Sequence, residues 1–96
     1  MTELTLVSTH GRSLKSLVKA AIENELRLLD AGVQRAEQRI KSFEAQYRLK
    51  TSDFIAKYEN DELEETLEFA EWIGESRLLA RMREKVDTLR GVTFAN

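Results

Sequence analysis

The stretch "LDAGVQRAEQRIKSFEAQY", residues 29–47, decides the fold. Its apolar residues recur in alternating steps of four and three, and they are Leu29, Val33, Ala36, Ile40, Phe43 and Tyr47. Steps of this kind place the side chains on one stripe of an α-helix and are typical of a coiled-coil seam. The stretch therefore predicts a long helix whose apolar stripe packs against another helix.

The same pattern continues toward the N-terminus. Ile22 and Leu26 extend the heptad, and before them the spacing becomes that of a globular helix, at Leu14, Leu17, Val18 and Ala21. Ser13 is a suitable N-cap. Gly32 alone weakens the helix, by about 1 kcal/mol relative to alanine. We predict one helix from Ser13 to about Arg48.

Acidic residues flank the seam on one side, at Glu23, Asp30, Glu37 and Glu44. In a parallel homodimer the pair Glu25–Asp30 would repel and only Arg39–Glu44 would attract. The favoured partner for the seam is therefore the chain's own third helix, or a helix of another chain with some positive charge.

Two further helices follow the first. The segment "KTSDFIAKYEN" predicts a short helix capped by Thr51 or Ser52. A third helix is expected over residues 61–90, because Asp61 and Glu64 have the spacing of a capping box. The chain is thus predicted to be all-α, a long antiparallel helical hairpin with a short connecting helix.

The predicted helical hairpin domain covers residues 13–90. Residues 1–12 are expected to be a flexible tail, the alternative being a strand that docks on a partner, and residues 91–96 a C-terminal tail that frays or docks through Val92 and Phe94. A chain of 96 residues forms one domain of marginal stability. Two apolar stripes this long are too large to cover each other fully, so we expect a dimer in a coiled-coil or four-helix arrangement.

Composition excludes several classes of site. The absence of cysteine rules out disulfides, thiol catalysis and thiolate metal sites. A net charge of −2 gives no general attraction to nucleic acid or anionic lipid. The start "MTELTLVSTHGR" lacks the features of a signal peptide, and no stretch is long enough to span a bilayer. We expect a cytoplasmic protein without cofactor or metal that binds no membrane and, alone, no nucleic acid.

Charge is divided between the halves of the third helix. Eight acids and no base lie between residues 59 and 75, whereas bases predominate from residue 77 to residue 90. This order suits the helix dipole. In an antiparallel hairpin the acidic half lies beside the bases that end the first helix, Arg35, Arg39, Lys41, Arg48 and Lys50. Such pairs favour the antiparallel arrangement but contribute only about 0–1 kcal/mol each.

The acids also permit one enzymatic interpretation. Glu68 with Glu71 forms E-x-x-E, and Glu84 with Asp87 forms E-x-x-D, motifs that hold magnesium in all-helical nucleotide pyrophosphatases of the MazG type. On one continuous helix Glu68 and Glu84 would lie roughly 24 Å apart, too far to share a metal. His10 has no partner for a metal site, so we predict no enzyme, with the pyrophosphatase as a remote alternative.

Large apolar residues are crowded near the middle of the third helix. Phe69, Trp72 and Ile73 lie within five positions and cannot all face one way. Most of this surface is expected in the core, and some of it is expected to need a second chain.

The second half of the chain resembles small antitoxin-like helical proteins encoded beside toxins of the TumE type. Their pattern is a long helix ending in F-E-x-x-Y, a segment like S-x-x-x-F, an acidic E-L stretch, and E-W before a final amphipathic helix. The matching residues here are Phe43, Glu44, Tyr47, Ser52 or Asp53, Phe54, Glu62, Leu63, Glu71 and Trp72. The resemblance implies a cognate protein toxin as partner.

The leading hypothesis is therefore an antitoxin-like protein that covers a basic face of its toxin with apolar and acidic helix surface. The candidate contact residues are Phe43, Tyr47, Phe54, Glu64, Glu68, Phe69, Glu71 and Trp72. The alternative is a structural homo-oligomeric coiled-coil scaffold without a dedicated toxin.

Overall fold

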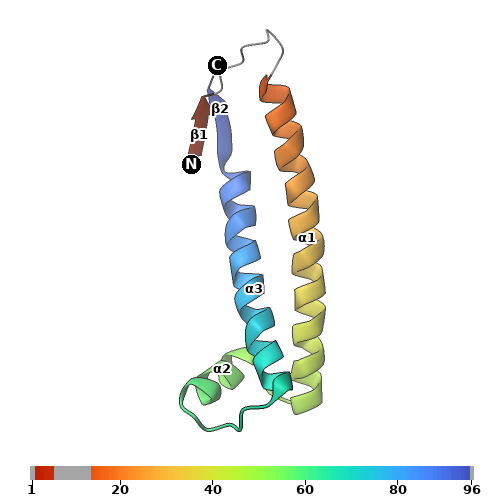
Figure 1. Cartoon of the computed structure of the whole chain (residues 1–96), viewed down its shortest axis with the longest axis vertical. Helices are drawn as coiled ribbons and strands as arrows, with labels where there is room; N and C mark the ends of the chain where they lie inside the picture. Colours follow the sequence, from red (N-terminus) through yellow and green to blue (C-terminus); the bar gives the residue numbers. More distant parts are fainter. Residues whose placement is uncertain (1, 6–13, 96) are drawn as a thin grey trace.

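The computed structural model describes residues 2–5 and 14–95. Two long helices lie side by side and antiparallel, and a short helix packs at the end far from the chain termini (Figure 1). The elements are β1 (Thr2–Thr5), α1 (Leu14–Tyr47), α2 (Thr51–Glu59), α3 (Leu67–Arg90) and β2 (Val92–Ala95). The predicted all-α hairpin with its short connecting helix is confirmed.

The heptad seam packs against the chain's own third helix. Four of its residues are buried, namely Leu29, Ala36, Ile40 and Phe43. The facing residues of α3 that are buried are Trp72, Ile73, Leu79 and Val86. Most of them form one continuous core with Phe54 of α2. The main core therefore lies toward the α2 end, where three helices meet.

The predicted start of the third helix is wrong. Asp61 has a positive φ of 55° and ends α2, because the N–H of Glu62 reaches back to the carbonyl of Lys57 at 3.0 Å. Aspartate tolerates this left-handed backbone better than most residues, which is why it suits a helix end here. The helix instead begins at Leu67, where Thr66 Oγ1 accepts a hydrogen bond from the Phe69 N–H at 3.1 Å.

Short strands occupy parts of both predicted tails. Thr2–Thr5 pairs in parallel with Val92–Ala95, in the register Thr2↔Val92. Both segments contain β-branched residues, and the hairpin brings its two open ends to the same side. The partner of the N-terminal strand is thus the chain's own C-terminal strand. The rest of the N-terminal tail and the predicted cap Ser13 lie outside the described residues.

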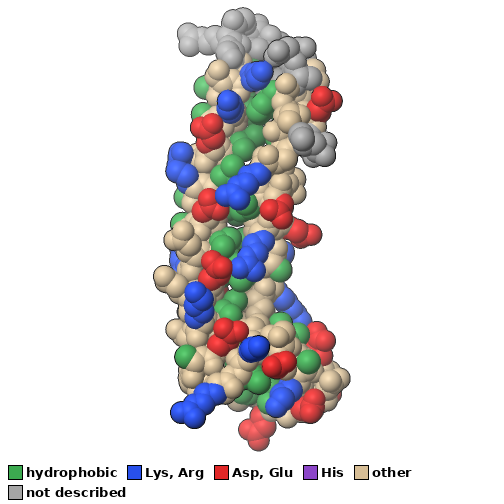
Figure 2. Space-filling view, turned by 180° about the vertical axis from the view of Figure 1, so that it is seen from behind, with side chains coloured by type: hydrophobic (Ala, Val, Ile, Leu, Met, Phe, Trp, Pro, Cys, Tyr) green, Lys and Arg blue, Asp and Glu red, His purple; other side chains and the backbone are tan. Residues whose placement is uncertain are grey.

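The hairpin is much longer than it is wide. It measures 60 × 22 × 18 Å and has a radius of gyration of 19.0 Å, against about 12.5 Å for a compact domain of this length. Its accessible surface of 7408 Å² exceeds the roughly 5,700 Å² of a compact monomer of 11.1 kDa. On the face in Figure 2, charged side chains of both signs flank a hydrophobic groove between two helices. The fold therefore exposes an unusual amount of surface for its size.

Candidate functional site

Most of the predicted aromatic contact residues form the core at the α2 end. Phe54 and Trp72 are 0% exposed, and their stacked rings lie 3.8 Å apart between centroids. Phe43 stacks on Trp72 at 5.5 Å. Tyr47 and Phe69 are half-buried at the edge of this cluster and meet edge to face at 5.1 Å. Phe43, Phe54 and Trp72 consequently offer almost no side-chain surface to a partner.

A chain of hydrogen bonds holds this cluster to both neighbouring helices. The indole N–H of Trp72 donates to Thr51 Oγ1 at 3.0 Å. Thr51 in turn donates to Glu44 Oε2 twice, from its hydroxyl and from its backbone N–H, each at 2.9 Å. Glu44 thereby satisfies the first turn of α2, where the side chain of Lys50 makes no capping bond. These groups position α2 and have a structural role.

Glu68 is engaged within the chain although it is exposed. The hydroxyl of Tyr47 donates a short hydrogen bond to Glu68 Oε2, and Gln46 Nε2 donates to the same oxygen at 3.1 Å. The hydrogen bond to Glu68, followed by partial desolvation and the carboxylate's negative charge, raises the pKa of Tyr47 above its ordinary value of 10.0. The pair joins the end of α1 to the start of α3.

Arg39 of α1 pairs with acids of α3, as predicted for an antiparallel hairpin. Its guanidinium lies 3.3 Å from Glu71 and 3.5 Å from Glu75 on the acidic half of α3. Two more ion pairs join the same helices, Arg83–Glu37 at 2.8 Å and Arg90–Asp30 at 3.5 Å. All are largely exposed, so each is worth about 0–1 kcal/mol.

A second group of acids stays unpaired at the α2 end. Five acids lie between residues 59 and 65, at Glu59, Asp61, Glu62, Glu64 and Glu65, and all are exposed. Within residues 2–5 and 14–95, none of them forms an ion pair. We call this segment, residues 59–65, the acidic connection. It contains Glu64, one of the predicted contact residues, and it is joined to Leu67 by Thr66 alone.

Four large apolar side chains are exposed on the long helices. They are Leu17 (65% exposed), Leu28 (61%), Leu67 (77%) and Leu78 (44%). Each helix carries two of them eleven residues apart, which is about three helical turns, so the two side chains of each pair share one line.

Both lines lie on the same side of the hairpin. Leu28 is eleven residues before Arg39 on α1, and Leu78 is seven residues after Glu71 on α3, so each shares a face with that charged residue. The Arg39–Glu71 ion pair joins these two faces. We call this side, defined by Leu17, Leu28, Leu67 and Leu78, the leucine side.

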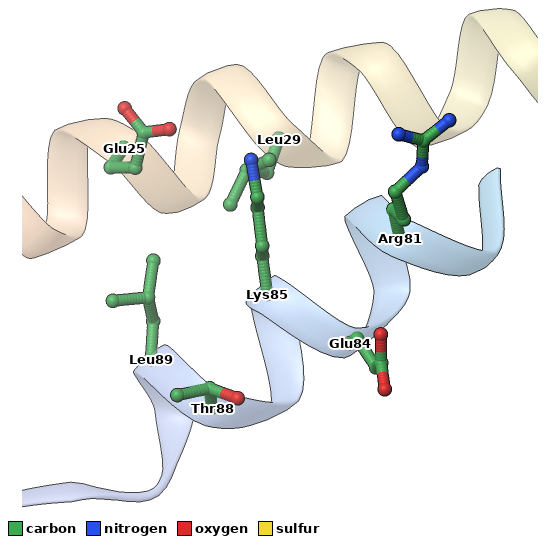
Figure 3. A pocket seen from close by; sticks show the side chains of 7 residues that line it. All are labelled: Glu25, Leu29, Arg81, Glu84, Lys85, Thr88 and Leu89. Carbon is green, nitrogen blue, oxygen red and sulfur yellow. The ribbon is translucent and has the colours of Figure 1, made fainter. Parts of the chain in front are cut away.

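A groove opens between α1 and α3 toward the termini (Figure 3). It has a volume of about 470 Å³ and is lined by Glu25, Leu29, Arg81, Glu84, Lys85, Thr88 and Leu89. The side chains of Arg81 and Lys85 point toward α1, whereas Glu84 points away from it (Figure 3). Apolar side chains from both helices flank the groove, which is shallow and open to solvent. It is therefore a surface feature suited to contact with another chain.

The carboxylates of the enzymatic interpretation do not converge. Glu68, Glu71, Glu84 and Asp87 all lie on the uninterrupted helix α3, so the two motifs are roughly 24 Å apart. In the part of the chain that the structure describes, no group of three or more acidic or histidine side chains is arranged to hold a metal ion. His10 lies outside the described residues.

Comparison with known proteins found no matching family model, no similar curated protein and no similar solved structure. None of the helices described here is both long enough and apolar enough to cross a bilayer.

The exposed leucines are the feature that sequence reasoning did not bring together. Leu17 was expected in the apolar stripe of the first helix, and Leu28 was not singled out. The sequence did contain one indication, which is the spacing of eleven residues within each pair. Eleven residues are about three helical turns, so both leucines of a pair lie on one line that is separate from the heptad seam.

Proposed function

We propose that the protein binds a basic protein partner, in the manner of an antitoxin that covers its toxin, through the α2 end of the hairpin. The observation that carries this proposal is the exposure of Leu67 amid unpaired acids. Leu67 is 77% exposed and lies two residues after the acidic connection, so it combines an apolar anchor with a charged surround.

The chemistry of this end favours a partner with positive charge. The five acids of the acidic connection are exposed and unneutralised, and Glu68 continues the same negative surface on α3. Opposite charge on the partner speeds encounter and selects against acidic proteins, while burial of Leu67 supplies affinity. The binding surface we propose therefore consists of residues 59–65 with Leu67, Glu68 and Leu78, and it omits the buried aromatic residues.

Co-expression with the product of the neighbouring gene tests the proposal. We expect the two proteins to purify together and the chain to restore growth to cells that the neighbouring product arrests. Leu67→Glu should weaken the complex by at least 30-fold in Kd, the equivalent of about 2 kcal/mol for a central contact residue. Binding should also weaken as salt rises, because screening reduces charge attraction. Failure of both co-purification and growth rescue would contradict the proposal.

A matched variant separates partner binding from general damage. Leu28→Glu makes the same change at a similarly exposed leucine on the leucine side, but near the middle of α1 and roughly 28 Å along the helix from its end at α2. We expect this variant to bind the partner normally. Equal loss in both variants would show that the acidic end is not the binding surface.

The alternative, a homo-oligomeric scaffold, is favoured by one observation of its own. Leu17 and Leu28 lie far from the acidic connection, and the positions between them on the same line, Ala21 and Asn24, carry no charge. A scaffold predicts a stable oligomer of the chain alone and no effect of Leu67→Glu on any activity in the cell.

A further inference from the structure

The first half of α1 carries a second apolar face that α3 does not cover. Leu28 and Leu29 are adjacent and so point about 100° apart. Leu29 is buried against α3, whereas Leu28 is 61% exposed. On the line of Leu28 the helix continues through Ala21 to Leu17 without any charged residue among these three positions.

We propose that this face binds the same face of a second copy of the chain, with the two α1 helices antiparallel and a two-fold axis near Asn24. A closed two-fold contact requires that residue i meets residue j and that j meets i. About an axis between residues 24 and 25, Leu28 lies opposite Ala21 of the second copy. Leu17 lies close to the small residue Ala31 of the second copy. Each large side chain thus meets a small one, which is the arrangement that fills space between helices.

The parallel alternative does not fit equally well. A parallel two-fold pair in register would set Leu28 on Leu28 and Ala21 on Ala21, which overfills one level and leaves another empty. It would also place Arg35 beside Arg35, a like-charge contact. The antiparallel pair instead brings Asn24 close to its own copy. A polar residue at such a position fixes register and orientation in helix pairs.

The face of α1 supplies part of the area that a stable pair needs. Residues 14–35 span about 33 Å along the helix. An α-helix with its side chains is about 11 Å wide, so this face alone gives roughly 350 Å² per copy, and reaching the about 800 Å² per partner of standard interfaces requires flanking contacts from the rest of the hairpin. The groove lined by Leu29 and Leu89 opens beside this face, since Glu25 at its edge lies about 60° from Leu28 on the helix. A second copy would cover part of it.

Solution mass tests the proposal on the purified chain alone, independently of any partner. We expect sedimentation equilibrium at about 50 µM to give twice the 11.1 kDa of the chain. Leu28→Glu should return the mass to that of one chain with an unchanged helical circular dichroism signal, because this side chain is exposed in the single hairpin. Leu67→Glu is the matched control and should stay dimeric. A monomeric wild-type protein would overturn the proposal, as would a Leu28→Glu variant that remains dimeric.

Cross-linking tests the orientation. The chain has no cysteine, so one introduced cysteine is the only thiol. Asn24→Cys should form a disulfide-linked dimer under mild oxidation, because the residue lies beside its own copy. Leu17→Cys should not, since its copy would lie about 22 Å away along the antiparallel helices. Linkage of Leu17→Cys as efficient as that of Asn24→Cys would overturn the antiparallel pairing.

Discussion

Replacing Gly32 or Gly74 by alanine adds the same methyl group to two different environments. Both glycines lie inside helices, so each substitution removes the same excess backbone entropy of the unfolded chain, worth about 0.5–1 kcal/mol. A Cβ at Gly74 meets no atom within 4 Å. We therefore expect Gly74→Ala to stabilise the protein by about 0.5–1 kcal/mol.

At Gly32 the same gain is opposed by a clash. A Cβ there would lie 2.8 Å from Met82 Sδ, well inside ordinary contact distance. The sulfur is in the middle of the side chain, so the whole methionine or the α1–α3 spacing must shift. Overpacking of this kind costs about 1–3 kcal/mol, the lower part of that range applying to a flexible methionine. With a clash cost of about 1–2 kcal/mol set against the gain of about 0.5–1 kcal/mol, Gly32→Ala should be neutral or destabilising by up to about 1.5 kcal/mol.

Urea unfolding followed by the fluorescence of buried Trp72 measures both effects. All variants are compared at one protein concentration, because a dimer's midpoint depends on concentration. In the Met82→Ala background the clash is gone, so Gly32→Ala should recover its stabilising effect, with a coupling energy of about 1–2 kcal/mol. Equal stabilisation by Gly32→Ala and Gly74→Ala in the parent protein would refute the close approach of the two helices.

Two further changes probe the polar contacts of the aromatic cluster. Thr51→Val removes the acceptor of the Trp72 indole N–H and should lower the free energy of urea unfolding by about 1–3 kcal/mol. Thr51→Ser keeps the hydroxyl and should lower it by less. Equal losses in the two variants would contradict the role of the hydrogen bond. In a Tyr58→Phe variant, which leaves Tyr47 as the one tyrosine, absorbance titration should place the pKa of Tyr47 above 10.0. Adding Glu68→Gln should lower this pKa, because it removes the negative charge of the acceptor. Because the folded state holds this proton more tightly, the associated stability is complete below pH 10 and falls as the pH rises above it. An unshifted midpoint in the folded protein would contradict the contact.

The seam of α1 could be predicted because it depends on local periodicity alone. Leu29, Ala36, Ile40 and Phe43 repeat at heptad spacing, and burial of any one implies burial of the others. The start of α3 could not, because Asp61 suits either a helix start or the left-handed residue that ends one. The choice depends on where α2 stops, and the hydrogen bond from the Glu62 N–H to the Lys57 carbonyl closes that helix end at Asp61. The pairing of β1 with β2 could not be predicted either, because it joins residues from opposite ends of the sequence.

The candidate surface was predicted only in its charged part. Glu64 lies in the exposed acidic connection, as an acidic contact surface requires, but Phe43, Phe54 and Trp72 are core residues. Sequence alone gives no means of separating an aromatic residue that fills a core from one that binds a partner, because both are large and apolar. The distinction comes from the short helix α2, which covers one side of the hairpin and buries those rings.

The position of α2 at one end of the hairpin also explains why two separate apolar surfaces stay exposed. The short helix α2 packs at one end, so only there does the core contain three helices and fully buried rings. Toward the termini two helices alone face each other, and a pair of helices buries only one stripe of each. Leu28 lies in this two-helix region, and Leu17 lies beyond the end of α3, where α1 runs beside β2 (Figure 1). A second copy would supply the missing layer at both positions. Leu67 lies at the other end, beside acids that a self-association of like charges would not favour. A basic partner and a second copy would therefore bind at opposite ends of one hairpin without competing.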